Sequence, residues 1–337
     1  MDKNDFAGIE VSQDELWVAL RREEQTLPLK SFPNTPEGHR AVARLLARKK
    51  HVVRVCLEST GVYGLDLALR LQKHPGVEVM VANPRAVRHF AQALMQRSKT
   101  DPLDARVLLE FAARMPFQSW QPPSATTLHL CALARRIEAI TDLLVAERNR
   151  LHAASAARAL PAAVRQDLRR SLAFHERALA RLTRQALQLL ARDPLLQERF
   201  EQLDSIPGIA ATSAIALLAE LSLLSPDLDV RQWVATAGLD PREYSSGTSV
   251  RRKTRISKAG NRHLRRALYM PALVAVQHDP LLRAFYQHLL ARGKEKLQAL
   301  VAVMRKLLHA IFGIFKHRQL YDGSKLFPVA LCTPEAA

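Results

Sequence analysis

Four acidic residues in the first third of the chain have the types and spacing to hold a divalent metal ion: Glu10, Glu58, Asp101 and Asp104. Glu10 lies within an apolar run typical of a strand, and Glu58 ends another such run. Asp101 and Asp104 would share one face of a helix. Magnesium prefers hard oxygen ligands, and a site for two metal ions needs several carboxylates around a phosphate. If the four acids meet at one edge of a sheet, they predict a Mg²⁺ site.

Ordinary structural roles explain the same acids. Because Pro102 suits the first position of a helix, Asp101 could be its N-cap and Asp104 could complete a variant of the capping box. Glu58 could be a loop acid. Spacing alone favours these roles, since isolated pairs of acids are common.

A basic segment that also contains serines is the second group with chemical potential. Between Tyr244 and Arg266 the chain has eight Lys or Arg residues and no acid, a density typical of a surface that binds phosphates. These cations are Arg251, Arg252, Lys253, Arg255, Lys258, Arg262, Arg265 and Arg266. The helix expected after Asn261 would add backbone N–H groups that can hold a phosphate.

The serines of this segment allow two interpretations. A hydroxyl among arginines could attack a phosphodiester, because the cations would stabilise the charge of the transition state. Alternatively, the segment could be a flexible polar loop that only contacts the backbone of the nucleic acid, formed by Ser245, Ser246, Thr248 and Ser249. The residue types alone favour the interpretation as a polar loop.

A Pro-Gly turn upstream, at Pro207 and Gly208, is followed by an apolar helix. It resembles the hairpin of helix-hairpin-helix modules, in which backbone N–H groups contact phosphates and position a duplex without selecting its sequence. Gly208 is therefore a further candidate for nucleic-acid binding.

The elements that must position these groups fall into three regions. Residues 1–118 have an α/β pattern, with strands expected at 6–11, 15–20, 27–32, 52–57 and 77–81, and helices at 36–49, 63–72, 84–95 and 102–114. Together they predict a mixed sheet covered by helices. Residues 119–200 show only helical spacing and predict a long helical hairpin or coiled coil. Residues 201–337 are predicted to be helical again.

Bulk composition indicates the partner. The 337 residues have a formal net charge of +18, which favours a long polyanion such as DNA or RNA, with an anionic membrane surface as the competitor. The sequence has no evident signal peptide, lipidation motif or uninterrupted apolar span. Three widely spaced cysteines, Cys56, Cys131 and Cys332, argue against a disulfide framework and a zinc site. We expect a cytoplasmic protein that associates with the nucleoid.

An ordered series of motifs along nearly the whole chain resembles one family, the DEDD transposases of IS110-type insertion sequences, relatives of pilin-gene invertases and of bridge-RNA-guided recombinases. The motifs are GIEVS at 8–12, LESTGVY at 57–63, NP at 83–84, KTDPLDA at 99–105, IPGI at 206–209, AGL at 237–239, YSSG at 244–247, SKAG at 257–260 and LRRALY at 264–269.

The resemblance implies a fold and a chemistry. It implies a RuvC-like domain of the RNase H fold over 1–118, a coiled-coil region for oligomerisation over 119–200, and a helical transposase domain over 201–337. It implies that Glu10, Glu58, Asp101 and Asp104 bind Mg²⁺ and that Ser246 forms a covalent phosphoserine link to DNA. It further implies a dimer or tetramer in which one subunit supplies the carboxylates, and a structured guide RNA. The family's first acid is normally aspartate, whereas here it is Glu10, which is one methylene longer.

Two other functions remain compatible with the residues. A RuvC-like junction nuclease would use only the carboxylates. A non-catalytic nucleic-acid-binding protein would show salt-sensitive binding without metal-dependent strand breakage.

Overall fold

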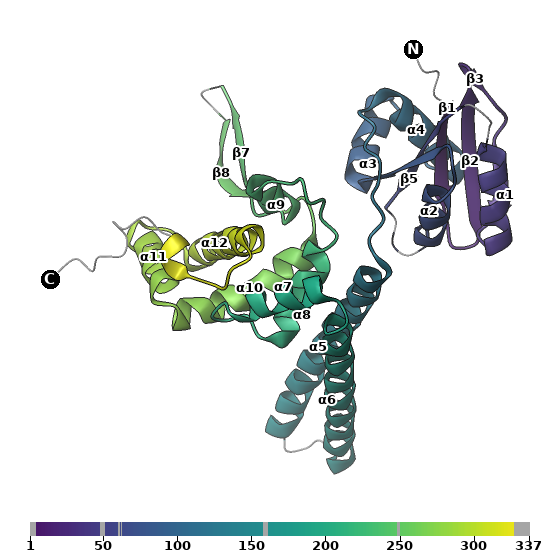
Figure 1. Ribbon diagram of the computed structural model, residues 1–337. Helices are drawn as coiled ribbons and strands as arrows, with labels where there is room; N and C mark the ends of the chain where they lie inside the picture. Colours follow the sequence, from purple (N-terminus) through teal and green to yellow (C-terminus); the bar gives the residue numbers. More distant parts are fainter. Residues whose placement is uncertain are drawn as a thin grey trace. The chain divides into compact units, whose positions relative to one another are not determined.

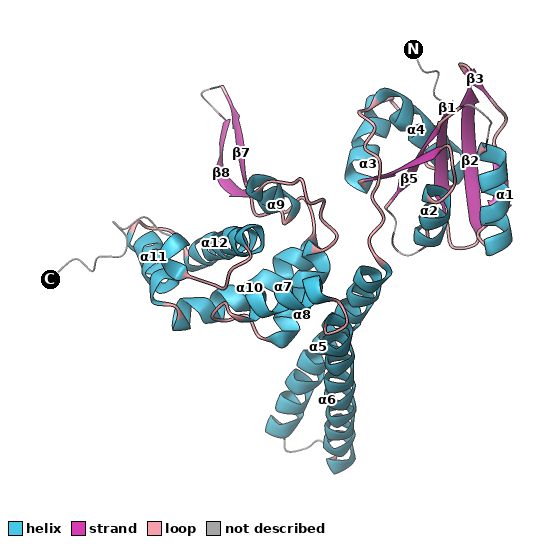
Figure 2. Cartoon of the chain, viewed as in Figure 1, coloured by secondary structure: helices cyan, strands magenta, loops and turns pink. Residues whose placement is uncertain are grey.

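The computed structural model describes residues 5–47, 51–59, 61, 63–157, 161–247 and 250–326, without the side chains of residues 251–253 and 326 (Figure 1). The chain divides into two compact units, Met1–Pro122 and Pro123–Ala337. The first is a mixed α/β unit. The second is mainly helical and includes one β-hairpin (Figure 2).

Unit 1 is built on a mixed sheet in the order β3-β2-β1-β5-β6, with β4 also paired to β2. Strands β1 and β2 are antiparallel, whereas β1, β5 and β6 are parallel. The strands are β1 (Asp5–Val11), β2 (Glu15–Arg22), β3 (Gln25–Thr26), β4 (Lys30–Pro33), β5 (Val53–Glu58) and β6 (Val77–Ala82). The predicted α/β class is confirmed.

Helices cover both faces of this sheet. The helices are α1 (Pro36–Leu46), α2 (Leu65–Gln72), α3 (Pro84–Ala93) and α4 (Asp101–Arg114). Val42 of α1 and Leu67 of α2 pack with Ile9 in one apolar core. Val87 of α3 and Leu108 of α4 pack with other strand residues in a second core. Because side chains alternate along a strand, the two cores lie on opposite faces of the sheet.

The predicted strand at 27–32 is wrong in its bounds. The chain instead forms the two-residue strand β3 and then β4, which begins at Lys30. Pro28 lies between them and has no N–H to donate to a ladder, which explains the interruption.

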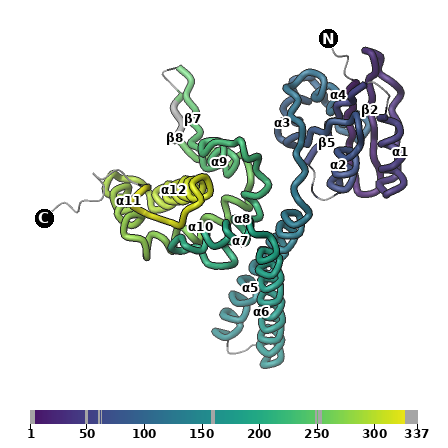
Figure 3. The backbone as a smooth tube through the Cα atoms, in the orientation of Figure 1, coloured from purple at the N-terminus to yellow at the C-terminus, as the bar shows by residue number. Residues whose placement is uncertain are grey.

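Unit 2 begins with two long helices that pack side by side, α5 (Ala125–Ala156) and α6 (Ala162–Leu190) (Figure 3). The remaining helices are α7 (Pro194–Asp204), α8 (Ala211–Leu221), α9 (Val230–Thr236), α10 (Arg262–His278), α11 (Pro280–Ala291), α12 (Lys296–His317) and the 3₁₀ helix η1 (Gly323–Leu326). Leu130 of α5 and Leu190 of α6 share one core with α8, α10 and α12. Residues predicted as a separate middle region therefore pack against the last region.

Helix α12 is the one helix among the described residues that is long and apolar enough to cross a membrane. Half of its apolar window is buried within the unit, and Val303, Leu307 and Ile311 belong to the core. This burial is what a core helix requires.

The prediction that the last region is helical did not include two strands that the structure contains. Strands β7 (Pro241–Ser246) and β8 (Val250–Ile256) form an antiparallel hairpin between α9 and α10 (Figure 2). All six residues of β7 are exposed, so this strand has no buried apolar face from which alternation could have been recognised.

Candidate functional site

Two of the four acids lie side by side on neighbouring parallel strands. The register of β1 and β5 pairs Ile9 with Leu57, so Glu10 and Glu58 follow at the same level. Alternation puts Glu10 on the same face as Gly8, and a β-carbon on Gly8 would meet the backbone of α4. The two glutamates therefore face the side of the sheet that α4 covers.

Helix α4 brings the other two acids to this face. Asp101 and Asp104 both lie in its first turn, with Asp101 exposed and Asp104 half-buried. The N-cap is Thr100, which makes no side-chain capping hydrogen bond. The interpretation of Asp101 as the N-cap is therefore wrong, because the helix begins one residue earlier than Pro102.

The acids interact electrostatically. The pKa of Glu10 is raised to about 7, mainly by burial and then by the negative charges of Glu58, Asp104 and Asp101, in that order, while Lys99 opposes the increase. Burial also raises the pKa of Glu58 and of Asp104, and Lys99 opposes both increases. Like charges held close together in this way favour the uptake of a proton or of a cation.

The donor set suits a divalent metal ion, because all four side chains offer hard carboxylate oxygens. In the described part of the chain, no three His, Cys, Asp or Glu side chains lie close enough together to hold a metal ion. The four carboxylates are thus near enough to repel one another, but they are not arranged around a common metal position.

Two residues of this site were not singled out from the sequence. Lys99 is the cation that counteracts the mutual repulsion of the acids, and Gly8 allows α4 to lie against β1. Lys99 lies in the KTDPLDA motif and Gly8 in the GIEVS motif. Membership of these motifs was the sequence signal that could have identified them.

Ser246 lies elsewhere in the chain, in unit 2. It is the last residue of β7 and pairs with Val250 immediately before the tip of the hairpin. The Ser246 side chain is exposed, as is Tyr244 on the same strand. Gly247 follows with φ +56°, a left-handed conformation that glycine adopts without strain. The interpretation of the serines as a flexible loop is wrong at Ser245 and Ser246, which are strand residues.

The predicted cations around Ser246 have different surroundings. Arg255, Lys258 and Arg262 are exposed. The side chains of Arg251, Arg252 and Lys253 lie outside the described residues, although Arg251 is paired with Ser245 in the hairpin.

Two of the predicted cations have partners within unit 2. The Arg265 Nη1 donates to the carbonyl oxygen of Ala237 at 2.8 Å. The Arg266 Nη1 donates to Asp142 Oδ2 at 2.8 Å and lies 3.2 Å from Glu138 Oε1. These contacts join α10 to the rest of the unit, and nucleic-acid binding by Arg265 and Arg266 stays a prediction.

The start of α10 does not offer the free N–H groups that we expected. Asn261 is the N-cap, and its side chain accepts hydrogen bonds from the backbone nitrogens of His263 and Leu264. Asparagine is a favourable N-cap because its side-chain oxygen satisfies these donors.

Gly208 occupies the expected turn between α7 and α8, with φ +95°. A β-carbon there would lie 2.7 Å from the carbonyl oxygen of Pro271. The glycine thus allows the turn to approach α10, and its contact with nucleic acid stays a prediction.

Known protein families match both the region that contains the four acids and the region that contains Ser246. A DEDD transposase profile of the IS110 type matches residues 7–155, and a profile described as the transposase IS116/IS110/IS902 family matches residues 200–287. The pilin gene-inverting protein of Moraxella bovis is 30% identical over 271 residues, which are 80% of this chain and 82% of that protein. This chain therefore belongs to the IS110 family of transposases and is a DNA recombination enzyme.

Two further similarities cover less of the chain. An uncharacterised protein of the insertion element IS110 from Streptomyces coelicolor is 31% identical over 151 residues, 45% of this chain and 36% of that protein. Among solved structures, T. thermophilus RuvC in complex with a Holliday junction substrate is 17% identical, with 34% of this chain and 98% of that chain covered and a TM-score of 0.27.

Proposed function

We propose that this transposase cuts and rejoins DNA at specific sites through a covalent bond between Ser246 and a DNA phosphate, with Mg²⁺ held by the carboxylates of unit 1. The observation that supports this most strongly is the meeting of acids from three separate segments on one face of the sheet. Burial and these like charges together raise the pKa of Glu10 to about 7, and neither aspartate is the N-cap of α4. Such a cluster is costly unless a cation or a proton neutralises it.

Glu10, Glu58, Asp101 and Asp104 would hold the metal ion. When bound, Mg²⁺ supplies Lewis-acid stabilisation of the charge that develops on the phosphate oxygens. The chain's own part is to keep the four carboxylates on two strands and one helix turn, with Lys99 beside them. Glu10 would be the metal ligand at the position where the family normally has aspartate, with a side chain that is one methylene longer.

The serine step exchanges one ester for another. The Ser246 Oγ attacks the phosphorus of the scissile phosphodiester and forms an Oγ–P bond as it loses its proton. The bond between phosphorus and the leaving sugar oxygen breaks, and that oxygen takes up a proton. A sugar hydroxyl of the recipient strand then attacks the phosphoserine and releases Ser246, so that the bond energy is conserved. The exposed position of Ser246 at the end of β7 supports this role, because a DNA strand could reach its hydroxyl.

The remaining parts of the proposal come from the family resemblance. Unit 1 would be a RuvC-like domain of the RNase H fold, which its mixed sheet accommodates. The paired helices α5 and α6 would form the coiled-coil region of a dimer or tetramer. A structured guide RNA would accompany donor and target DNA in the cytoplasm, and the net charge of +18 suits two polyanions.

The test uses the purified full-length protein, its co-purifying nucleic acid, Mg²⁺ and a labelled DNA that contains the element's own junction. We expect the wild type and Ser245→Ala to form a protein–DNA adduct that survives denaturation, and Ser246→Ala to form none. Asp104→Asn should also form none. An adduct with Ser246→Ala would refute the assignment of the nucleophile.

A hydrolytic nuclease is the second candidate, because all four carboxylates lie in unit 1 and Ser246 lies in unit 2. In that case Ser246→Ala would still cut DNA in the presence of Mg²⁺ and would release both ends free, whereas Asp104→Asn would not cut.

A further inference from the structure

We propose that a groove between α1 and α2, on the face of the sheet opposite the acids, binds the phosphate backbone of a nucleic-acid strand. The inference rests on the proposed function, since it takes nucleic acid as the substrate. It adds a second contact surface on unit 1, and the cations of this surface lie outside both the family motifs and the carboxylate site.

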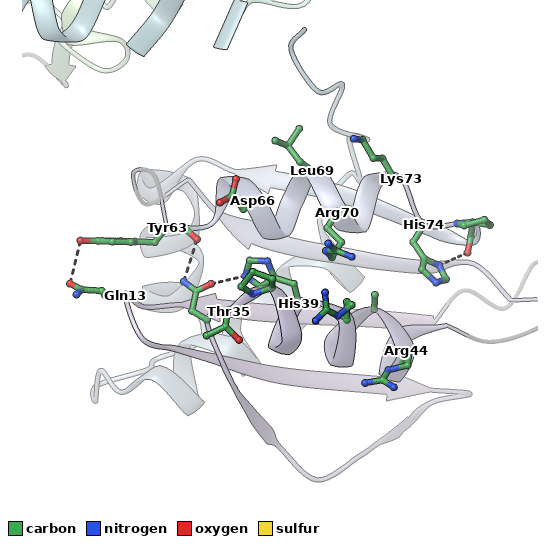
Figure 4. Close-up of a pocket in the computed structure, with 15 residues that line it drawn as sticks. Gln13, Thr35, His39, Arg44, Tyr63, Asp66, Leu69, Arg70, Lys73 and His74 are labelled. Atoms are coloured by element: carbon green, nitrogen blue, oxygen red, sulfur yellow. Dashed lines mark hydrogen bonds between the residues drawn. The ribbon is translucent and has the colours of Figure 1, made fainter. Parts of the chain in front are cut away.

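The groove is a cavity of about 1150 Å³. Helix α1 forms one wall and α2 the other, and Figure 4 shows Arg70 between the two helices and Arg44 on α1. Gln13 and Tyr63 close one end, and His74 lies at the opposite end. The lining therefore comes from four segments that the fold brings together.

Most charges in the lining are positive. Arg40 and Arg44 lie one turn apart on α1, and Arg70 and Lys73 lie three residues apart on α2 and at its end, so each pair shares a face. Asp66 is the one acid among the residues that line this cavity. Two facing rows of cations along the same channel suit a ligand with repeated negative charges.

Most of these cations are free to bind an anion. Arg44, Arg70 and Lys73 are exposed, and none of them forms an ion pair with another described residue. Arg40 alone is paired, with Glu37. Unpaired cations in a hollow attract anions more strongly than cations on a convex surface, because the surrounding protein concentrates the field.

The floor of the groove contains a buried histidine that is held by hydrogen bonds. His39 is buried, and burial lowers its pKa, an effect that Arg70 reinforces and Asp66 opposes. The imidazole hydrogen-bonds to Asn34 Oδ1, with Nε2 2.7 Å from that oxygen. Asn34 Nδ2 in turn donates to the carbonyl oxygens of Ser12 at 2.8 Å and Tyr63 at 3.3 Å. One side chain thus holds three segments at the mouth of the groove.

A polymer fits this channel better than a small phosphate ester. Helix α1 is 11 residues long, which corresponds to about 16 Å at the usual rise. A DNA strand presents one negative charge about every 3.4 Å, so several phosphates would face the cations. Apolar residues between the charges, such as Leu69 and Pro36, suit the sugars.

The mouth of the groove is suited to a base. Tyr63 is 48% exposed, and its hydroxyl donates to Gln13 Oε1 at 3.4 Å. An exposed aromatic ring at the end of a basic channel can stack on a nucleotide base. Gln13 and Tyr63 also follow β1 and β5, the strands of Glu10 and Glu58, so the mouth lies at the edge of the sheet where these acids are found. A strand bound in the groove would leave it at that edge.

The test compares two double variants of the full-length protein that remove the same charge. Arg44→Gln/Arg70→Gln changes the groove, and Arg169→Gln/Arg170→Gln changes two exposed cations of α6. Binding to a short duplex DNA and to an RNA hairpin, both of arbitrary sequence, is measured over a range of salt concentrations. Tyr63→Ala and Lys73→Glu serve as second variants of the groove.

We expect the groove variant to bind about tenfold more weakly at moderate salt, with a slope of log affinity against log salt that is shallower by about 1.4 to 1.8, the value for two lost phosphate contacts. The α6 variant should keep at least most of its affinity. A loss with DNA alone or with RNA alone supports the groove and identifies its polymer.

Two results would overturn the inference: an unchanged affinity in the groove variants, or an equal loss in the α6 variant. Failure of the proposed function is separate, because it would appear as a wild-type protein that forms no covalent adduct or binds neither probe. If the wild type binds and the groove variants bind equally well, only the groove inference fails.

Discussion

Gly8 of β1 and Leu109 of α4 approach so closely that a β-carbon on Gly8 would lie 2.1 Å from the backbone nitrogen of Leu109. Such a carbon would also lie 2.2 Å from the carbonyl oxygen of Ala105. Backbone atoms cannot rotate away as a side chain can, so the helix itself would have to move. The position of Asp101 and Asp104 relative to Glu10 therefore depends on the absence of a side chain at Gly8.

Gly8→Ala should displace α4 and separate the acids. We expect the free energy of unfolding to fall by about 1–3 kcal/mol, as overpacking usually costs, and Mg²⁺-dependent DNA cleavage to fall much more than the folded fraction does. Urea denaturation and cleavage assays on the same preparation measure both effects. Gly64→Ala is the matched control in unit 1, since a β-carbon there meets Val11 only at ordinary distances of 3.8 Å or more. Normal cleavage by Gly8→Ala would contradict this account.

Glu10 should make the stability of the metal-free protein depend on pH. Its pKa is about 7 in the folded protein and 4.5 ordinarily, so between these values the folded state binds a proton that the unfolded state has lost. The free energy of unfolding therefore falls as pH rises through this window. Glu10→Gln removes the effect and should be more stable than the wild type by about 1–2 kcal/mol at about pH 8, after allowance for solvent screening, but not at about pH 5.

Urea denaturation of the wild type and of Glu10→Gln in the presence of a chelator checks this prediction. Added Mg²⁺ should then raise the stability of the wild type more than that of the variant, because a bound cation removes the same repulsion. Equal pH profiles for the two proteins would show that Glu10 does not lie among interacting charges.

Glu220 should be important for the stability of unit 2. It is only 2% exposed and accepts hydrogen bonds from Arg135 Nε at 2.8 Å and from Asn261 Nδ2 at 2.5 Å. Glu220→Ala leaves both donors unpaired, and we expect a loss of about 2 kcal/mol, because Arg135 can still reach water. Glu176→Ala removes an exposed partner of Arg148 and should cost less than about 1 kcal/mol in the same denaturation experiment. Similar losses in both variants would refute the distinction.

Mixing two inactive variants should restore activity if one subunit supplies the serine and another the carboxylates. Ser246→Ala protein retains the acids of unit 1, and Asp104→Asn protein retains the serine of unit 2. A mixed assembly would contain one complete site, so we expect a fraction of the wild-type adduct after co-purification of differently tagged variants. Verified mixed assemblies without any adduct would show that both groups must come from the same chain.

The sequence predicted unit 1 well because its elements are marked by local chemistry. Thr35 and Asn83 cap α1 and α3 with a proline immediately after each, and the parallel strands β5 and β6 are short apolar runs. The weak strand near Leu27 failed because Pro28 interrupts it, an effect that outweighs the apolar pattern.

The site was less predictable than the fold. Spacing could not show whether Asp101 caps α4, since that depends on where the helix begins, and the cap proved to be Thr100. Nor could a count of cations show that Arg266 is paired with Asp142, a residue 124 positions away. The β7–β8 hairpin was missed because the exposed residues of β7 leave no hydrophobic period. The assignment of Ser246 came from the order of the family motifs and stays a prediction.

The exposed hairpin has a consequence for how the sequence can diverge. None of the residues of β7 is buried, so the folding of unit 2 places little demand on them. If Ser246 is the nucleophile that we propose, substitutions near it would be selected mainly by the DNA that this strand contacts. Buried residues of the α8 and α10 core are restricted by packing instead. Under that proposal, the hairpin could change its DNA preference without compensating changes in the core of unit 2.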